Sequence, residues 1–438
     1  MGSRRALKNC FGARGQILVM VTIAVPVLIL FAGLAIDFGI AYTDKAALSR
    51  AVDAAALEGM RNLAKGTTTA QRLAQDTFNV DVQALGSYST APSFSFNKNT
   101  DASGNQSVTV TGTVYWQPTF LRIVLSSTVP ITQSSTVSRA PLYMALVLDQ
   151  SYSMTQNGGA SALPGAVTNF VNQFDDTQDH VGIVSFATYA TTGVQLKNSP
   201  PFKSATSTYV NGMSFSLTDC YTFAQTGIDN GLAQINSVTL PSNAQKVLVF
   251  FTDGWPNMIQ DKLACTKTTT TTLNFTMCDS GDDSLGLCST SWPLSVFTTS
   301  GASTTCNGCT SYPSYSTTSC NPTPSGMTFH SNQYNKSESL TNGGTGQSNV
   351  QAEAIYRTET SAATAQAQNV TVYSIGLGSA ITNQTTAKNF LYQVANDSDG
   401  PTYNSSYPQG EAVFAPTSAQ LDTVFQEIAS KILLRITQ

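Results

Sequence analysis

Residues 142–153 read LYMALVLDQSYS, an apolar run that ends at Asp149 and is followed by two serines. A short run this apolar predicts a strand buried on both faces, as in a parallel sheet covered by helices. In such sheets, ligands bind outside the carboxyl ends of the strands. We therefore expect Asp149, Ser151 and Ser153 to lie on a turn at that edge. Their carboxylate and hydroxyl oxygens are hard ligands, which suit Mg²⁺, Mn²⁺ or Ca²⁺.

Two further segments lead to the same edge. Residues 246–254 read KVLVFFTDG, a second buried strand that ends at Asp253. Between the two strands, Thr222 precedes a helical segment. Taken singly, Thr222 is an ordinary helix cap and Asp253-Gly254 an ordinary turn. Together, however, these residues follow one another in the chain, and each lies at a strand end or a helix start. This order predicts that they share one cation site.

This arrangement resembles the von Willebrand factor type A domain and its metal-ion-dependent adhesion site. The family's D-x-S-x-S turn, its threonine at a helix start and its strand-closing aspartate match Asp149, Ser151, Ser153, Thr222 and Asp253. Thr222 is preferred to Thr218 because Gly227 and Ile228 follow it at the family's spacing. The resemblance covers residues 141–436 and implies one divalent cation, with Mg²⁺ preferred to Mn²⁺ or Ca²⁺.

The expected chemistry is binding and not catalysis, so we predict that the protein is not an enzyme. Two carboxylates and three hydroxyls leave a divalent cation short of anionic charge, with one coordination position open. An acidic side chain of a partner protein is expected to fill that position.

Hydrolytic alternatives lack a residue that they need. A serine nucleophile requires a nearby base, yet His180 opens a strand at the opposite edge and His330 lies in an irregular insert. A phosphatase with a strand-end aspartate would need a second carboxylate at position 151, which is a serine. No glycine-rich phosphate loop accompanies the strands.

Strands alternate with helices through the rest of this segment. We expect strands at 142–148, 181–187, 192–196, 246–252, 370–376 and 412–415, and helices at 161–174, 222–237, 349–368, 383–396 and 418–434. This alternation predicts an α/β fold with a doubly wound, mostly parallel sheet. The short strand at 192–196 follows its neighbour closely and is expected to be an antiparallel edge.

An apolar segment near the N-terminus predicts a membrane anchor. Residues 17–36 (ILVMVTIAVPVLILFAGLAI) are uncharged and long enough to span a bilayer. The preceding cations, Arg4, Arg5, Lys8 and Arg14, predict that residues 1–16 are cytoplasmic and that the rest is periplasmic or extracellular. A cleavable signal peptide is the alternative, but no small-x-small cleavage site precedes Asp37. We predict a single-pass anchor whose outer end is marked by Asp37.

Residues 37–140 are expected to form a helical stalk and a small antiparallel β domain with a pilin-like outline. The alanine-rich segment 41–64 predicts a helix that packs either on its own sheet, which we favour, or on similar helices of other proteins. Residues 104–137 alternate in polarity, as antiparallel strands do.

Residues 12–60 are similar to the N-terminal segment of TadG-like proteins of the Tad (Flp) pilus assembly system. The markers are Arg14-Gly15-Gln16, Asp37 and the alanine-rich helix from Lys45. Prepilin-type cleavage after Gly15 would need a glutamate where the chain has Met20. The resemblance implies other Tad pilus components as partners, and many members of this family carry a metal-site domain behind the anchor.

Composition and cysteine usage agree with export. Charged residues make up 11% of the chain and the formal net charge is −4, so nucleic-acid binding is not expected. Six cysteines lie within 265–320, inside a Thr/Ser-rich insert at 255–347 of the domain 141–438. Export favours disulfides over a zinc site at Cys306 and Cys309. Seven exported cysteines leave one thiol free or paired with another chain.

The insert begins just after Asp253, so we expect it to emerge on the metal face, with Cys220 placed to tether it. We predict a rim or lid over the cation that sets which partner can reach it. The alternative is a spacer directed away from the site.

Two functions follow from the sequence. The first is metal-dependent protein interaction or adhesion by a membrane-anchored protein, serving Tad/Flp pilus assembly. The second is a structural pilin-like subunit in which the metal site only stabilises the fold.

Overall fold

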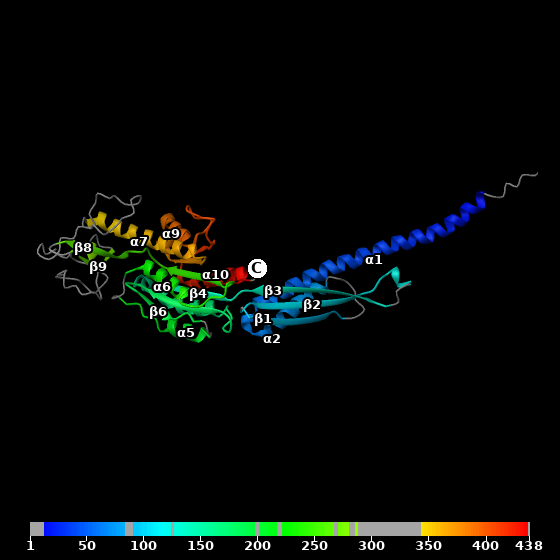
Figure 1. Cartoon of the computed structure of the whole chain (residues 1–438), viewed down its shortest axis with the longest axis horizontal. Coiled ribbons are helices and arrows are strands. Elements are labelled where there is room, and N and C mark those ends of the chain that lie inside the picture. Colours follow the sequence, from blue (N-terminus) through cyan, green and yellow to red (C-terminus); the bar gives the residue numbers. More distant parts are fainter. Residues whose placement is uncertain are drawn as a thin grey trace, which may run out of the picture. The chain divides into compact units, whose positions relative to one another are not determined.

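The computed structural model describes residues 13–83, 91–102, 104–123, 127–197, 201–216, 221–266, 270–279, 285–287 and 343–436. The chain divides into two compact units. The first extends to Arg139, and the second comprises Ala140–Ile436 with the short stretch Ala102–Gly104 (Figure 1). Each unit has its own hydrophobic core.

The N-terminal unit consists of two helices against a three-stranded antiparallel sheet. Helix α1 (Ala13–Arg61) continues through Pro26 and is followed by the 3-10 turn η1 (Leu63–Lys65) and by α2 (Thr67–Gln83). The sheet has the order β1-β2-β3, formed by β1 (Ser93–Thr100), β2 (Gln106–Trp116) and β3 (Val129–Arg139). A short 3-10 turn, η2 (Leu121–Ile123), lies between β2 and β3.

The alanine-rich part of α1 packs on this sheet, as we favoured. Every second residue of β2 is buried, as expected of a strand with one covered face. The buried valines of β2 share one core with the small and apolar residues of α1, among them Leu48, Ala51, Val52, Ala55 and Ala56. Helix α2, which the sequence reading missed, completes this core with Ala70, Ala74, Phe78 and Val82.

The second unit is built on a six-stranded sheet of order β12-β11-β7-β4-β5-β6. All neighbouring strands are parallel except β5 and β6. The predicted doubly wound sheet with an antiparallel edge is therefore confirmed. Its strands are β4 (Leu142–Asp149), β5 (His180–Phe186), β6 (Ala190–Val194), β7 (Gln245–Thr252), β11 (Thr371–Leu377) and β12 (Ala412–Ala415).

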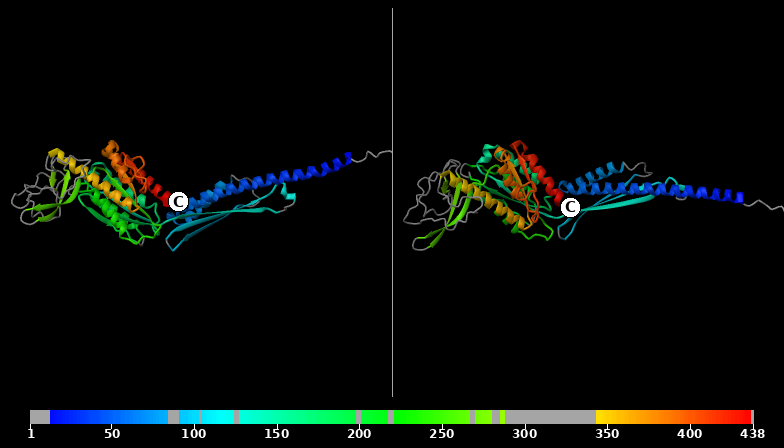
Figure 2. Two further views of the ribbon diagram at one scale, coloured as in Figure 1. Left: turned by 45° about the horizontal axis from the view of Figure 1, so that its top comes forward. Right: turned by 90° about the horizontal axis from the view of Figure 1, so that it is seen from above.

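Helices cover both faces of this sheet (Figure 2). They are α3 (Ser153–Gln156), α4 (Gly159–Val171), α5 (Lys203–Asn211), α6 (Ala224–Asn236), α7 (Gly343–Ala367), α8 (Ser379–Thr382), α9 (Thr385–Ala395) and α10 (Leu421–Ile436). The last helix follows the 3-10 turn η3 (Ser418–Gln420), whose capping box pairs Thr417 with Gln420.

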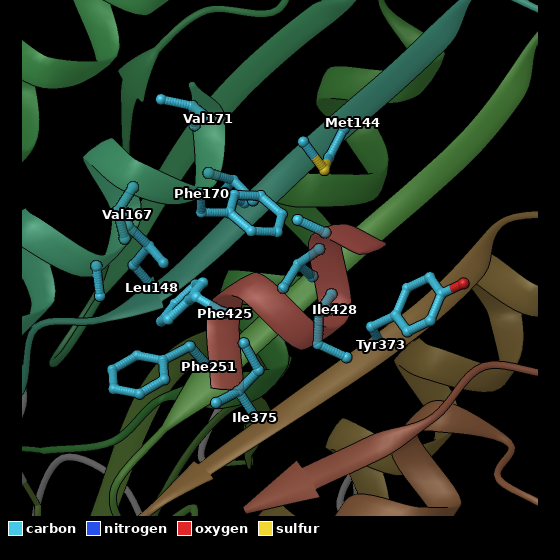
Figure 3. Close-up of a cluster of buried hydrophobic side chains, with 14 of the residues drawn as sticks. Met144, Leu148, Val167, Phe170, Val171, Phe251, Tyr373, Ile375, Phe425 and Ile428 are labelled. Atoms are coloured by element: carbon cyan, nitrogen blue, oxygen red, sulfur yellow. The ribbon is translucent and has the colours of Figure 1, made fainter. Parts of the chain in front are cut away.

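Strand β4 shows why both faces are buried. Its even-numbered residues, from Leu142 to Leu148, join a core with α4 and α10 (Figure 3). Its odd-numbered residues, from Tyr143 to Val147, join a second core with α6, α7 and α9. Because successive side chains of a strand point to opposite faces, an unbroken apolar run is what two covered faces require.

The insert contains strands that the sequence reading did not predict. Strands β8 (Met258–Thr266), β9 (Thr270–Asp279) and β10 (Leu285–Leu287) form a separate antiparallel sheet. Helix α5 was also missed. The cysteines at 10, 220, 288, 306, 309 and 320 lie outside the described residues, as do His330 and the N-terminal cations Arg4, Arg5 and Lys8. The disulfide, zinc and topology expectations that rest on them stay predictions.

Candidate metal centre

The two carboxylates of the candidate site stand at the same edge of the sheet. Asp149 is the last residue of β4, and Asp253 directly follows β7, the parallel neighbour of β4. Both side chains are buried, with 0% and 1% of their surface exposed. Burial of two acidic groups in an otherwise apolar sheet demands specific partners.

A chain of hydrogen bonds joins four of the five predicted residues. The Ser151 amide donates to Asp149 Oδ1 at 2.8 Å, and the hydroxyl oxygens of Ser151 and Ser153 are 2.9 Å apart. Ser153 Oγ in turn donates to Asp253 Oδ1 at 2.7 Å. The turn after β4 and the end of β7 therefore direct their oxygens to one place.

Thr222 is held at this edge by its backbone. Its amide donates to Asn257 Oδ1 at 2.8 Å, and its carbonyl accepts from the Asn257 amide at 3.2 Å. The next residue, Phe223, donates to the carbonyl of Ala187, just beyond β5. Helix α6 begins at Ala224 and has no side-chain cap, so the predicted start at 222 was wrong and Thr222 is not a capping residue.

Two glycines let α6 approach the sheet closely. A Cβ on Gly231 would lie 2.6 Å from Val147 Cγ2, and one on Gly227 would lie 2.7 Å from Phe186 Cδ1. Contacts this short are not found between real side chains, so larger residues would push α6 away from β4. The close approach of α6 also sets the position of Thr222, two residues before its start.

Sequence reasoning missed two residues that complete the site. Thr252 Oγ1 donates to Asp149 Oδ2 at 2.6 Å, and Asn157 Nδ2 donates to Asp253 Oδ2 at 2.9 Å. With the bonds from Ser151 and Ser153, every carboxylate oxygen thus accepts one hydrogen bond. Thr252 directly precedes Asp253 in the sequence, so its place at the same strand end could have been predicted. Nothing in the sequence marks Asn157.

The surroundings of the two carboxylates disfavour their charged forms. Burial, and then the charge of Asp253, raises the pKa of Asp149 to about 7, despite the hydrogen bonds from Ser151 and Thr252. Burial likewise raises the pKa of Asp253, despite the donors Ser153 and Asn157. Among the residues whose side chains are described, no Lys or Arg forms an ion pair with either carboxylate. A bound cation would stabilise the charged forms of both carboxylates.

The donor set fits a hard divalent cation. All five predicted ligands offer oxygen, and Mg²⁺, Mn²⁺ and Ca²⁺ prefer oxygen ligands. Within the described ranges, no three His, Cys, Asp or Glu side chains lie together, so the candidate site combines only two carboxylates with hydroxyl oxygens.

His180 lies away from this edge, as the sequence predicted. It is the first residue of β5, and its ring stacks on Tyr143 with 4.2 Å between the centroids. Burial lowers its pKa. A histidine at the opposite end of the strand is not placed to activate Ser151 or Ser153.

The metal affinity is expected to rise with pH, because the cation must displace a proton from Asp149. Since the pKa of Asp149 is about 7, the dissociation constant for Mg²⁺ should fall about tenfold per pH unit between pH 5 and pH 7. Calorimetric titration at several pH values measures this slope. A pH-independent affinity would contradict the assignment of Asp149 as a ligand.

The metal-free protein is expected to show the opposite trend. The fold raises the pKa of Asp149 from 3.8 to about 7, so the protonated form is favoured in the folded state. The contribution of this group to stability is complete below its unfolded pKa and is lost as the pH rises through about 7. Urea unfolding in EDTA at pH 5 and pH 8 measures the difference.

Solved structures that match the chain at low TM-scores include one of a mussel byssus protein and two of pilus proteins. The chain is 14% identical to proximal thread matrix protein 1 from the mussel byssus, with a zinc-occupied MIDAS motif, at TM-score 0.36, covering 67% of this chain and 46% of that one. It is 14% identical to the pilus adhesin SpaC of Lactobacillus rhamnosus GG, at TM-score 0.41, covering 79% and 34%. It is 14% identical to the vWF domain of the pilus tip protein Mfa5 of Porphyromonas gingivalis, at TM-score 0.40, covering 68% and 97%. The chain thus spans less than half the length of the first two.

Two family models match separate parts of the chain. Residues 144–284 match the von Willebrand factor type A domain, which includes all five predicted site positions. Residues 15–62 match the putative Flp pilus-assembly TadE/G-like family, which covers most of α1. A comparison with curated proteins gives no match. The chain therefore combines a TadE/G-like N-terminal segment with a von Willebrand factor type A domain.

Proposed function

We propose that this protein is a membrane-anchored adhesion or interaction protein of a Tad/Flp-type pilus system, which binds a partner protein through a divalent cation. The observation that carries the proposal is the hydrogen-bonded chain from Asp149 through Ser151 and Ser153 to Asp253. It brings two buried carboxylates and two hydroxyls together at the edge of a parallel sheet where ligands bind.

Asp149, Ser151, Ser153, Thr222 and Asp253 would hold the cation, with Mg²⁺ the proposed ion. The cation, when bound, supplies an electrophilic centre for an acidic side chain of the partner. The protein's own residues hold the carboxylates in place: Thr252 and Asn157 each occupy one carboxylate oxygen with a hydrogen bond. A fixed set of ligands that does not have to reorganise favours tight binding.

A binding role is favoured over catalysis by what surrounds the hydroxyls. The hydroxyls of Ser151 and Ser153 bond to each other, and Ser153 also bonds to Asp253; neither hydroxyl bonds to a histidine in the described part of the chain. Burial beside a second carboxylate raises the pKa of Asp149, and such a pair favours cation binding over a role as a base.

Helix α1 supports the proposed anchor. Its stretch Met20–Arg61 contains an 18-residue window of mean hydropathy 2.4, of which only 11% is buried. Large apolar side chains are exposed along it, including Met20, Ile23, Leu28 and Phe31. Such exposure is costly in water and favourable in a bilayer.

The insert is proposed to form a rim over the cation and to select the partner. Strand β7 ends at Thr252 and β8 begins at Met258, so the insert leaves the sheet at the edge that holds both carboxylates. Asn257, at the start of the insert, is tied to Thr222 by two hydrogen bonds. A rim at this place would restrict which partner reaches the metal.

Removing the hydroxyl of Thr222 is expected to weaken Mg²⁺ binding about tenfold, because an open-sided site loses one of few ligands. Thr222→Val keeps the side-chain volume, so the stability of the metal-free protein should change little. Calorimetric titration of Mg²⁺ into the full chain in detergent measures the affinity.

Thr206→Val is the matched control, because Thr206 is also buried but lies in α5, where its hydroxyl has no hydrogen-bond partner among the described residues. It should leave the Mg²⁺ affinity unchanged. Equal affinities for wild type and Thr222→Val would remove Thr222 from the ligand set.

The second candidate function is a structural pilin-like subunit. The long helix α1 packed on a small antiparallel sheet favours it, because the membrane half of such a helix is free to pack on others. Under this alternative, assemblies of the chain persist when Asp149 is replaced and when EDTA is added.

A further inference from the structure

Asp37 does more than mark the end of the apolar segment. Its Oδ1 accepts a hydrogen bond from the amide of Thr119 at 2.9 Å, and its Oδ2 accepts from the amides of Phe120 at 2.9 Å and Leu121 at 2.6 Å. Its side chain is fully buried. One carboxylate on α1 thus holds three consecutive amides of the connection between β2 and β3.

The same connection touches α1 one turn closer to the N-terminus. A Cβ on Gly33 would lie 2.8 Å from Phe120 Cβ, so only glycine leaves room for the aromatic side chain there. Gly33 precedes Asp37 by four residues and lies inside the predicted span 17–36, about 6 Å deeper along the helix axis. Phe120 therefore sits at the depth of the apolar segment and not beyond it.

We propose that residues 117–123 are a second membrane contact, with Phe120 and Leu121 in the outer part of the bilayer beside α1. This inference rests on the proposed membrane anchor. The partner is the acyl-chain region of the lipid, because Phe120 lies against Gly33 of α1 and, like the apolar side chains near that glycine, exposes apolar surface. Phe120 is 43% exposed, and Ile36 and Phe38 on the helix are 51% and 61% exposed.

The contacts of Asp37 explain how a loop tolerates this position. Moving a backbone amide from water into a bilayer costs free energy unless the amide finds a hydrogen-bond partner. Irregular backbone therefore enters a bilayer only where its amides are paired. Asp37 pairs three of them, and they in turn stabilise its charge. Arg122 is exposed beside Phe120, and a long basic side chain at this level reaches lipid phosphates. An aromatic residue, an aliphatic residue and a cation are typical of an interfacial segment.

The test places trifluoromethyl-phenylalanine at single positions of the full chain in lipid nanodiscs. Fluorine NMR then measures relaxation by a nitroxide on the lipid acyl chain and by a water-soluble gadolinium chelate. The positions are Phe120, Phe31 within the span, and Tyr189, an exposed aromatic residue of the second unit (56% exposed).

The probe at 120 is expected to respond to the lipid nitroxide as strongly as the probe at 31, and several times more strongly than the probe at 189. The second contact would be overturned if the gadolinium chelate relaxed the probe at 120 while the lipid nitroxide relaxed the probe at 31. That result would leave the proposed anchor intact. A probe at 120 shielded from both agents would mean a protein contact and would also overturn it. If the probe at 31 responded to the chelate, the anchor itself would fail.

Asp37→Ala tests the role of the carboxylate in the same discs. It should shift the probe at 120 from the lipid nitroxide towards the chelate, while the probe at 31 stays unchanged. An unchanged probe at 120 would show that Asp37 does not hold the loop in the membrane.

Discussion

Replacing Asp149 by asparagine is expected to abolish Mg²⁺ binding while making the metal-free protein more stable at pH 8. The asparagine keeps the shape of the side chain but removes one of two buried charges that repel each other. The loss of an anionic ligand at a site with only two should weaken Mg²⁺ binding more than 100-fold, about 3 kcal/mol or more. The gain in stability follows from removing an uncompensated buried charge.

Calorimetric titration and urea unfolding in EDTA measure the two effects on the same protein. Asp179→Asn is the matched control. Asp179 is also fully buried, but it lies directly before β5, at the amino-terminal end of that strand and not at the carboxyl ends where Asp149 and Asp253 lie. Its carboxylate accepts a hydrogen bond from the Asp175 amide at 2.7 Å. The control should lose stability and keep its Mg²⁺ affinity. An Asp149→Asn protein that binds Mg²⁺ normally would contradict the assigned site.

Phe425→Ala is expected to lower the stability of the second unit by about 3–5 kcal/mol, the usual cost of a large cavity in a core. Phe425 of α10 is fully buried, and its ring lies 5.5 Å from that of Phe170 and 5.8 Å from that of Phe251 (Figure 3). These residues belong to α4 and β7, so the substitution removes contacts of the last helix with both of these elements.

Denaturant unfolding of the full chain measures this loss, with Trp116 and Trp292 replaced by phenylalanine in all variants so that the fluorescence of Trp255 reports on the second unit. Tyr403→Ala is the control, because Tyr403 is 40% exposed between α9 and β12. A loss below about 1 kcal/mol for Phe425→Ala, as is typical of surface positions, would show that α10 does not complete the core.

The sequence predicted the sheet better than its surroundings, for a physical reason. β4, β7 and β11 are buried on both faces, so their apolar runs leave little freedom for another structure, and their ends agree with the prediction within about one residue. Helix α5 buries only Thr206 and Val210. Two buried residues are too few to produce a recognisable helical periodicity of apolar residues in the sequence. Strands β8 and β9 are rich in threonine and polar residues, which the sequence reading took for an irregular insert.

Helix α2 was missed although its sequence carried a signal. Ala70, Ala74, Phe78 and Val82 recur at four-residue spacing and are the buried residues of that helix. The pattern was diluted because two of the four are alanines. Hydrophobic periodicity detects a helix most easily when the buried face is large.

The five candidate ligand positions could be proposed from the sequence because each lies near a strand end or a helix start, and their binding of a cation stays a prediction. Asn157 could not be, because its contact with Asp253 depends on how the turn after β4 folds back towards β7. Asp37 shows the same limit in the N-terminal unit. Its place at the end of the apolar segment could be predicted from the sequence. Its hydrogen bonds to residues 119–121 could not, because those residues are more than eighty positions away in the chain.

The central claim is that the metal at this edge joins the protein to a partner. Affinity capture of the full-length tagged protein from its native membranes, with Mg²⁺ and with EDTA, tests it most directly. We predict partner proteins that are retained with Mg²⁺, released by EDTA and absent from the Asp149→Asn capture, but present in the Asp179→Asn capture. The same partners retained in EDTA and by Asp149→Asn would contradict metal-dependent binding and favour the structural subunit.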